Sequence, residues 1–252
     1  MEMKPHLIPQ LKALRLSGIL DTLDVRTQQA LAERWSYGDF LERLLEDEVE
    51  RRSQKQLALR LRRATLNSTK TLETFDFTFN LDLHRSLVYD LATGQFIREK
   101  RNVLICGPTG VGKSHLAQSL AHEACRRCFD VVFTDAHKML RHLNAGRVDG
   151  SYDKRLAIYT RADLLVIDDF GLKPMPNPAD MYDVITERYE KGAILLTSNR
   201  APAEWANWFV DPLLASAGLD RLSHRAAVII ITGSSYRAND RPPLGEKGAT
   251  IV

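Results

Sequence analysis

The octet at residues 107–114, Gly-Pro-Thr-Gly-Val-Gly-Lys-Ser, constrains the fold of this 252-residue chain more than any other feature. It matches the phosphate-binding loop pattern G-x-x-x-x-G-K-[ST] at every fixed position. The short apolar run at residues 102–106 precedes it, and a helical pattern at residues 114–121 follows it. Strand, glycine loop and helix are the context that this motif needs, so we expect a nucleotide site. The alternative, a glycine turn without a ligand, explains the flanks less well.

The residues of the loop have distinct expected roles. Glycines let backbone N–H groups turn toward a phosphate, and the start of the helix adds a partial positive charge. Lys113 can reach the β- and γ-phosphates of ATP, and Ser114 can ligate Mg²⁺. The residues predicted to bind the nucleotide are Gly107, Pro108, Thr109, Gly110, Val111, Gly112, Lys113, Ser114 and His115.

Short apolar runs recur along the rest of the chain. They lie at residues 102–106, 131–134, 164–167, 193–197 and 228–232 and are separated by segments with a helical pattern. Near-continuous apolar runs between helices indicate parallel strands that are buried on both faces. The predicted fold is therefore α/β, with a five-stranded parallel sheet.

Polar side chains follow two of these runs. Asp168 and Asp169 end the third run, and Asn199 follows the fourth. Ligands bind at the carboxyl ends of parallel strands, so we expect Asp168 to hold Mg²⁺ and Asp169 to orient a water molecule that attacks the phosphate. The amide of Asn199 could hold the same water. The alternatives are two aspartates that cap a strand-to-helix turn, and an ordinary turn asparagine.

The first seventy residues differ from the rest, because apolar residues recur there at helical spacing and no strand-like alternation is visible. We expect a helical N-terminal domain at residues 1–70, a nucleotide domain at 71–237 and a flexible tail at 238–252. The last predicted helix of the N-terminal domain is basic between Arg51 and Arg63, which indicates either a solvated face or a phosphate-contacting surface. The aromatics Phe75, Phe77 and Phe79 either seal the edge of the next domain or lie beside the adenine.

Taken together, these motifs resemble those of an AAA+ ATPase of the initiator and helicase-loader group. Residues 107–114 correspond to Walker A, residues 164–169 to Walker B and Asn199 to sensor 1. Residues 219–225 resemble the segment that carries an arginine finger, which implies Arg221 in that role with Arg225 as second choice. Residues 235–237, Ser-Tyr-Arg, resemble the end of DnaC-like helicase loaders, where Arg237 would act as sensor 2.

The whole chain except its C-terminal end resembles more closely the IstB family, the helper ATPases of insertion-sequence transposition. The similarity is clearest at residues 11–20, 73–77, 112–117 and 168–171. It implies hydrolysis of ATP with Mg²⁺, a ring or helical homo-oligomer with an arginine finger acting in trans, and double-stranded DNA and a cognate transposase as partners. A DnaC-like replicative helicase loader is the alternative. A metabolic kinase is disfavoured, because it would need neither Asn199 nor a helical N-terminal domain.

Two departures from the usual AAA+ pattern stand out. Most AAA+ proteins have Glu at the position of Asp169, whose carboxylate is one methylene shorter and reaches less far toward the water. Only 15 residues follow Arg237, so we expect no helical lid domain at the C-terminus.

The interval between the second and third predicted strands is rich in basic residues and longer than a simple connection needs. The resemblance to initiators implies a helical insertion here that faces nucleic acid, and an exposed basic face without a ligand is the alternative. The predicted DNA-binding residues are Lys138, Arg141, Arg147, Tyr152, Lys154 and Arg155.

Net charge and the lengths of the apolar stretches restrict the possible partners and location of the protein. The formal net charge is only +3, so basic residues must be concentrated locally if DNA binds. No apolar stretch approaches the ~20 residues that cross a bilayer, and the N-terminus lacks a signal-peptide pattern. We therefore expect a cytoplasmic protein without a membrane partner.

Overall fold

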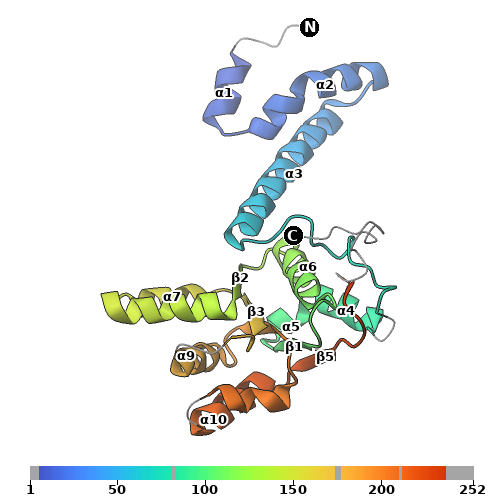
Figure 1. The fold of residues 1–252 in the computed structure, drawn as a ribbon. Helices are drawn as coiled ribbons and strands as arrows, with labels where there is room; N and C mark the ends of the chain where they lie inside the picture. The colour runs from blue at the N-terminus through green and yellow to red at the C-terminus, as the bar shows by residue number, and fades with distance from the viewer. Residues whose placement is uncertain (1–5, 81–82, 174–176, 210–211, 237–252) are drawn as a thin grey trace, which may run out of the picture. The chain divides into compact units, whose positions relative to one another are not determined.

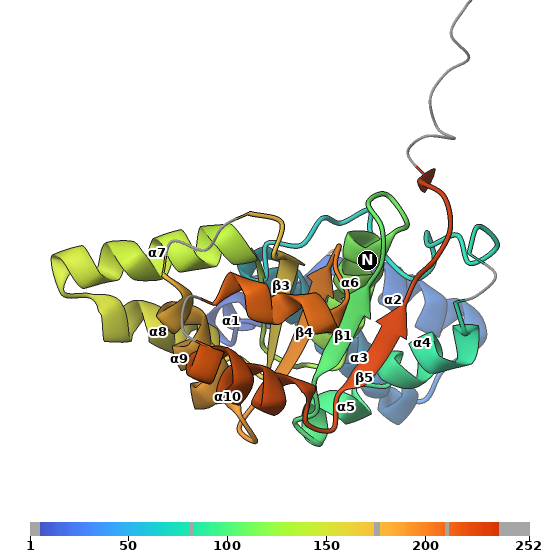
Figure 2. The same ribbon diagram turned by 60° about the horizontal axis from the view of Figure 1, so that its bottom comes forward.

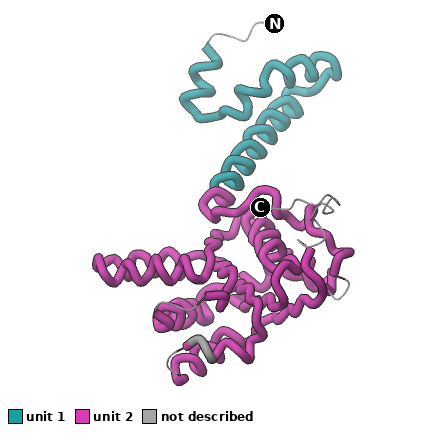
Figure 3. Tube along the Cα trace, in the orientation of Figure 1, with its two compact units in different colours: residues 1–59 teal, residues 60–252 magenta. Residues whose placement is uncertain are grey.

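The computed structural model describes residues 6–80, 83–173, 177–209 and 212–236, and divides the chain into two compact units, residues 1–59 and 60–252 (Figure 3). The units divide between residues 59 and 60, which is earlier in the chain than the boundary expected after residue 70. Residues 64–67 belong with the second unit because Ala64 is fully buried there and the N–H of Asn67 donates to Gln118 Oε1 at 3.2 Å. The tail at 238–252 lies outside the described residues.

Unit 1 is helical, as the spacing of its apolar residues predicts. It contains α1 (Leu7–Ala13), α2 (Ser17–Glu33) and most of α3 (Tyr37–Arg63) (Figure 1). Its small core consists of Leu11, Ile19, Leu23 and Leu44.

A buried carboxylate joins two helices of unit 1. The Oε2 atom of Glu48 in α3 accepts the backbone N–H groups of Gly18 at 2.6 Å and Ile19 at 3.4 Å, and its Oε1 atom accepts Arg52 Nε at 2.7 Å. Glu48 therefore satisfies first-turn donors of α2 that have no partner within that helix. A side chain at Gly18 would meet the Glu48 Cα atom at 2.7 Å, so this contact requires glycine.

Unit 2 is built on a five-stranded parallel sheet, which confirms the predicted fold class. The strand order is β2-β3-β4-β1-β5. The strands are β1 (Val103–Cys106), β2 (Val131–Asp135), β3 (Leu164–Phe170), β4 (Ala193–Ser198) and β5 (Ala227–Ile230).

Helices cover both faces of the sheet. The helices of this unit are α4 (Arg85–Ala92), α5 (Gln95–Arg98), α6 (Lys113–Arg126), α7 (Ala136–Asp149), α8 (Tyr152–Thr160), α9 (Pro178–Arg188), the 3-10 helix η1 (Pro202–Trp208) and α10 (Pro212–Ser223). One face carries α7, α9 and α10, which lie next to one another in Figures 1 and 2 and share a core with Leu104, Ile167 and Leu196 of the strands. Helix α6 packs across β1 to β4 from the other face. No helix of the described residues is both long and apolar enough to span a bilayer.

The topology determines where a ligand can bind. The chain leaves β1, enters α6 and returns as β2 at the far edge of the sheet, whereas β1 itself lies between β4 and β5. Crevices for ligands form at such switch points, outside the carboxyl ends of the strands. The glycine loop after β1 lies at this position.

Candidate nucleotide-binding site

The glycine loop is fixed on both sides by backbone contacts. The N–H of Gly107 donates to the carbonyl of Ser198 at 3.2 Å, and the carbonyl of Gly110 accepts the N–H of Tyr236 at 3.0 Å. Gly107 and Gly110 have positive φ values of 151° and 90°. A Cβ atom on Gly107 would lie 2.1 Å from the Ile231 carbonyl oxygen, so no side chain fits there.

The lysine of the motif lies inside the loop. Lys113 begins α6 and is only 5% exposed, and its Nζ atom donates to the Pro108 carbonyl across the loop at 2.7 Å. Gly112, with φ of 98°, makes the turn that starts the helix. The ammonium group and the first N–H groups of α6 thus converge on one place, which is the arrangement that binds phosphate.

The two acidic residues at the end of β3 are held by a side chain of β4. Thr197 Oγ1 donates to Asp168 Oδ1 at 2.5 Å and accepts the backbone N–H of Asp169 at 3.0 Å. Asp169 has a positive φ of 55°. Thr197 was not among the residues that the sequence singled out, and its position before Asn199 carries no motif signal.

A cavity of about 350 Å³ brings many of the predicted residues together, whereas Gly107, Pro108 and Asp168 are not among the residues that line it. Loop residues 109–115, Asp169 and Asn199 line it, with Lys113 and Ser114 among the loop residues. Its size fits a small organic ligand. The remaining lining residues are Lys70, Thr74, Phe75, Asp76, Phe79, Asn80, Leu172 and Tyr236.

Aromatic rings form one side of this cavity. Phe75 packs edge-on against the ring of His115 with centroids 5.3 Å apart, and Phe79 against Tyr236 at 5.0 Å. Phe77 instead stacks on Tyr89 at 5.9 Å. Phe75 and Phe79 therefore line the cavity, whereas Phe77 does not. Burial lowers the pKa of His115, so its ring is mostly neutral at pH 7.

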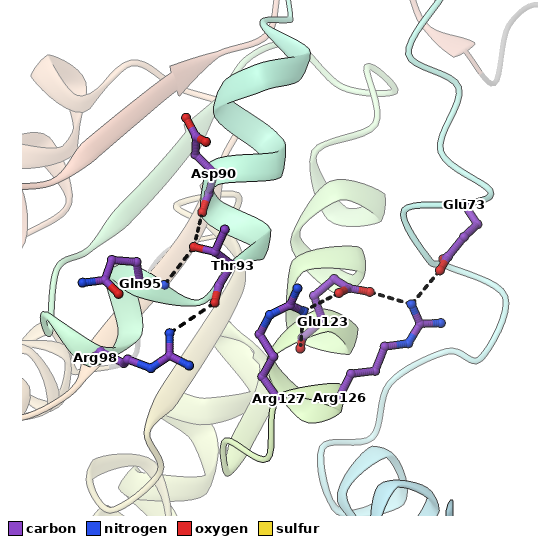
Figure 4. A network of polar contacts seen from close by, with 8 residues as sticks. All are labelled: Glu73, Asp90, Thr93, Gln95, Arg98, Glu123, Arg126 and Arg127. Carbon is purple, nitrogen blue, oxygen red and sulfur yellow. Dashed lines mark hydrogen bonds and ion pairs between the residues drawn. The ribbon is translucent and has the colours of Figure 1, made fainter.

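Two contacts near the cavity were not predicted from the sequence. The buried side chain of Asn80 donates to the Val111 carbonyl at 3.0 Å and so supports the loop from outside. The segment that leads to Phe75 is fastened to α6, because Arg126 Nη1 binds Glu73 Oε1 and Glu123 Oε1, each at 2.6 Å (Figure 4). The hydrogen bond from Arg126 lowers the pKa of Glu73 to about 2.

The oxygen ligands of the site suit Mg²⁺. The predicted ligands are the hydroxyl of Ser114, which lines the cavity, and the carboxylate of Asp168, which precedes the lining residue Asp169. No group of three or more His, Cys, Asp or Glu in the described part of the chain could hold a metal by itself. Mg²⁺ is usually bound by one or two carboxylates together with phosphate oxygens of the substrate. The residues present therefore fit an ion that binds with the nucleotide.

The candidate arginine finger lies away from this cavity. Arg221 and Arg225 line a second cavity, of about 240 Å³, together with Asn102 and Gly192, which directly precede β1 and β4. This cavity is at the amino-terminal edge of the sheet, opposite the glycine loop. Arg221 Nη1 donates to the Ala217 carbonyl at 2.8 Å. The proposed sensor 2, Arg237, lies outside the described residues.

The basic interval forms two helices, α7 and α8, and its predicted DNA-binding residues fall into two groups. Lys138, Arg141 and Lys154 are exposed. The other three have partners within the unit. Arg147 binds Asp180 and Asp183, Arg155 binds Asp149, and the Tyr152 hydroxyl donates to Asp183 at 2.6 Å while its ring lies 4.1 Å from the Arg147 guanidinium.

Solved structures with a similar fold include replication proteins. The DnaC helicase loader superposes with a TM-score of 0.57 at 20% identity, covering 65% of this chain and 97% of that one. DnaA of Aquifex aeolicus bound to AMPPCP gives 0.53 at 23% identity, covering 66% of this chain and 51% of that one. These likenesses show that unit 2 has the fold of an AAA+ domain.

Similar sequences come from insertion sequences. An insertion-sequence ATP-binding protein of Mycobacterium tuberculosis is 40% identical over 241 residues, which cover 94% of this chain and 96% of the relative. The IS21 ATP-binding protein of Pseudomonas aeruginosa is 34% identical over 241 residues, 95% of this chain and 90% of the relative. The family model "IstB-like ATP binding protein" matches residues 9–242. The chain therefore belongs to the IstB-like ATP-binding proteins, as its motifs predict.

Proposed function

We propose that this protein is an Mg²⁺-dependent ATPase that assembles into oligomers on double-stranded DNA and assists a transposase in choosing and remodelling its target. The observation that carries the proposal is the cavity in which Lys113, Ser114, Asp169 and Asn199 meet, in a member of an ATP-binding family. The names of its relatives supply the link to insertion sequences.

Each residue of the site has a different role in hydrolysis. Lys113 and the loop N–H groups hold the phosphates, and Phe75 and Phe79 border the space for the base. Ser114 and Asp168 would hold Mg²⁺, which when bound offsets the negative charge of the phosphate oxygens. Asp169 orients the attacking water, and Asn199 supports it through its amide. Most catalysis of phosphoryl transfer comes from such positioning and charge.

Assembly and DNA binding use other surfaces of unit 2. Arg221 lines a cavity at the amino-terminal edge of the sheet, away from the nucleotide cavity of its own subunit, and this supports a role at the nucleotide of a neighbouring subunit. Head-to-tail contacts of this kind generate rings or helical filaments. The exposed residues Lys138, Arg141 and Lys154 of α7 and α8 are proposed to contact DNA phosphates, which position a protein without specifying a sequence.

The proposal is tested by measuring phosphate release from ATP with purified protein, in Mg²⁺ and in EDTA, and then strand transfer by the transposase of the same element with and without this protein. We expect hydrolysis only with Mg²⁺, and transposition that depends on the protein and on ATP. Absence of hydrolysis in the presence of DNA and Mg²⁺ would contradict the ATPase; transposition unaffected by the protein would contradict the helper role.

A replicative helicase loader remains the alternative function, supported by the likeness of unit 2 to the DnaC loader. That likeness concerns the fold alone, whereas the family match spans residues 9–242. Binding of the full chain to the cognate transposase, measured beside binding to a replicative helicase, distinguishes the two functions.

A further inference from the structure

The regular pairing of β3 with β4 is interrupted near the carboxyl ends of the two strands. At this point two residues of β3, Asp168 and Asp169, stand opposite one residue of β4, Thr197. Such a bulge redirects side chains and is common beside active sites. Here it allows two successive acidic residues to differ in surroundings, since Asp169 lines the nucleotide cavity and Asp168 faces Thr197.

The hydroxyl group of Thr197 contacts both residues of this bulge. Thr197 is fully buried, and its Oγ1 atom donates to Asp168 Oδ1 at 2.5 Å and accepts the Asp169 N–H at 3.0 Å. The one hydroxyl proton is thus committed to the carboxylate. The oxygen of the same hydroxyl accepts the backbone N–H of Asp169 within the interrupted part of the ladder, and a buried donor that loses its acceptor is costly.

The hydrogen bond also restricts how Asp168 can bind a metal. With Oδ1 fixed, the carboxylate cannot rotate freely, and Oδ2 remains for a ligand. Groups that hydrogen-bond to metal-binding carboxylates in this way orient them, and their loss typically costs about 10- to 100-fold in metal affinity or activity.

We infer that Thr197 is a positioning residue, whose hydroxyl orients Asp168 toward the Mg²⁺ of the nucleotide and maintains the bulge that directs Asp169 into the cavity. The inference rests on the proposed ATPase function. It assigns to the strand before Asn199 a second role, because the same strand end that carries the water-holding amide also aligns the metal-holding carboxylate.

Ser198 offers a matched control on the same strand. It is equally buried, its Oγ atom donates to the Phe170 carbonyl at 2.9 Å and accepts the Arg200 N–H at 3.1 Å. This hydroxyl also ties β4 to β3, but it binds backbone groups and neither acidic side chain. Loss of the Ser198 hydroxyl therefore reports the effect of a missing strand contact alone.

The experiment compares Thr197→Val, Thr197→Ser and Ser198→Ala in the full chain. Each variant is assayed for kcat, KM and the Mg²⁺ concentration at half-maximal rate. Binding of a fluorescent ATP analogue is measured in EDTA and in Mg²⁺, and binding of Mn²⁺ with ATP by electron paramagnetic resonance. We expect Thr197→Val to lower kcat and weaken Mn²⁺ binding by about 10- to 100-fold. Its binding of the analogue in EDTA should match that of the wild type.

Thr197→Ser should recover most of the metal affinity, because it keeps the hydroxyl, and Ser198→Ala should keep the wild-type metal dependence. If Thr197→Val does not fold, Thr197→Cys replaces it, since a thiol of similar size is a weaker donor and should also weaken Mn²⁺ binding. Unchanged metal binding in either variant would overturn the inference, as would an equal shift in Ser198→Ala. If the wild type does not hydrolyse ATP, the proposed function fails, while Mn²⁺ binding still tests Thr197.

Discussion

At the scale of single residues, Lys113 and Asp169 line the same cavity. We expect substitution of Lys113 to weaken ATP binding and substitution of Asp169 to slow hydrolysis. Lys113→Ala removes a charged contact to phosphate, worth about 1.5–3 kcal/mol or roughly 10- to 150-fold in the Kd for ATP. Asp169→Asn keeps the shape of the side chain but not its charge. We expect it to leave the Kd unchanged and to lower kcat by about 10²- to 10⁴-fold. Isothermal titration calorimetry and phosphate release distinguish the two effects. Full hydrolysis by Asp169→Asn would transfer the water-orienting role to Asn199.

The sequence predicted some of these residues and not others for a physical reason. The loop glycines and Lys113 form a local motif, because one short segment must wrap one phosphate group. The contacts of Thr197 with Asp168 and of Asn80 with Val111 join segments 29 and 31 residues apart. No spacing rule encodes such pairs, since they arise only when the sheet and the loop have formed.

At the scale of elements, the N-terminus of α2 depends on a side chain from α3. Glu48→Gln leaves the two amides of Gly18 and Ile19 with a neutral acceptor and removes the ion pair with Arg52. We expect a loss of about 1.5–3 kcal/mol in the free energy of opening of α2, measured by amide hydrogen exchange. Glu50→Gln, on the exposed side of α3, is the matched control and should change little.

The same contact should depend on pH. Burial raises the pKa of Glu48, but the hydrogen bonds from Arg52, Gly18 and Ile19 outweigh it and lower the pKa below its usual value of 4.5. A lowered pKa in the folded state gives stability that is present above pH 4.5 and is lost as the pH falls through the folded value. The difference between wild type and Glu48→Gln should therefore be largest at neutral pH and shrink in acid. A difference that grows in acid would contradict this role.

The α7–α8 pair is the element proposed to contact DNA. Lys138→Ala, Arg141→Ala and Lys154→Ala together should weaken binding to unrelated duplexes alike. They should also flatten the plot of log affinity against log salt by up to ~0.9 for each phosphate that the variant no longer neutralises. Fluorescence anisotropy over a salt series measures both quantities. The exposed residues Lys55, Arg62 and Arg63 of α3 provide a control triple of equal charge. If only the control triple changes the slope, the DNA surface lies on α3.

The positions of the strands were more predictable from the sequence than the contacts between elements. Apolar runs predicted the five strands. A strand covered on both faces has to be apolar throughout, as β1 and β4 are, whereas the apolar edge strand β5 leaves Val228 and Ile230 exposed. The bulge at Asp168 and Asp169 and the internal ion pairs of Arg147 and Arg155 were not predictable. Each depends on a partner from another element, so a basic residue alone does not distinguish a phosphate contact from a bond to a neighbouring acid.

At the scale of the whole molecule, Arg221 should act on the nucleotide of a neighbour. Arg221→Ala should bind ATP normally, yet hydrolyse it about 10³- to 10⁵-fold more slowly. An excess of Lys113→Ala protein, which keeps Arg221, should partly restore hydrolysis at mixed interfaces. If Arg221→Ala is as active as the wild type, Arg221 is a surface residue whose pairing contributes under ~1 kcal/mol.

We further propose that ATP binding converts single subunits into an assembly that aligns many DNA-contacting surfaces along one duplex. Linked sites bind more tightly than single ones without any new contact. The most direct test is the affinity of the wild type for a duplex at fixed salt, measured by fluorescence anisotropy with ATP and Mg²⁺, with ADP and Mg²⁺, and without nucleotide. We predict an affinity at least ~10-fold higher with ATP, abolished in Lys113→Ala and unaffected by duplex sequence. Equal affinity under all three conditions, with ATP shown to be bound, would contradict the account.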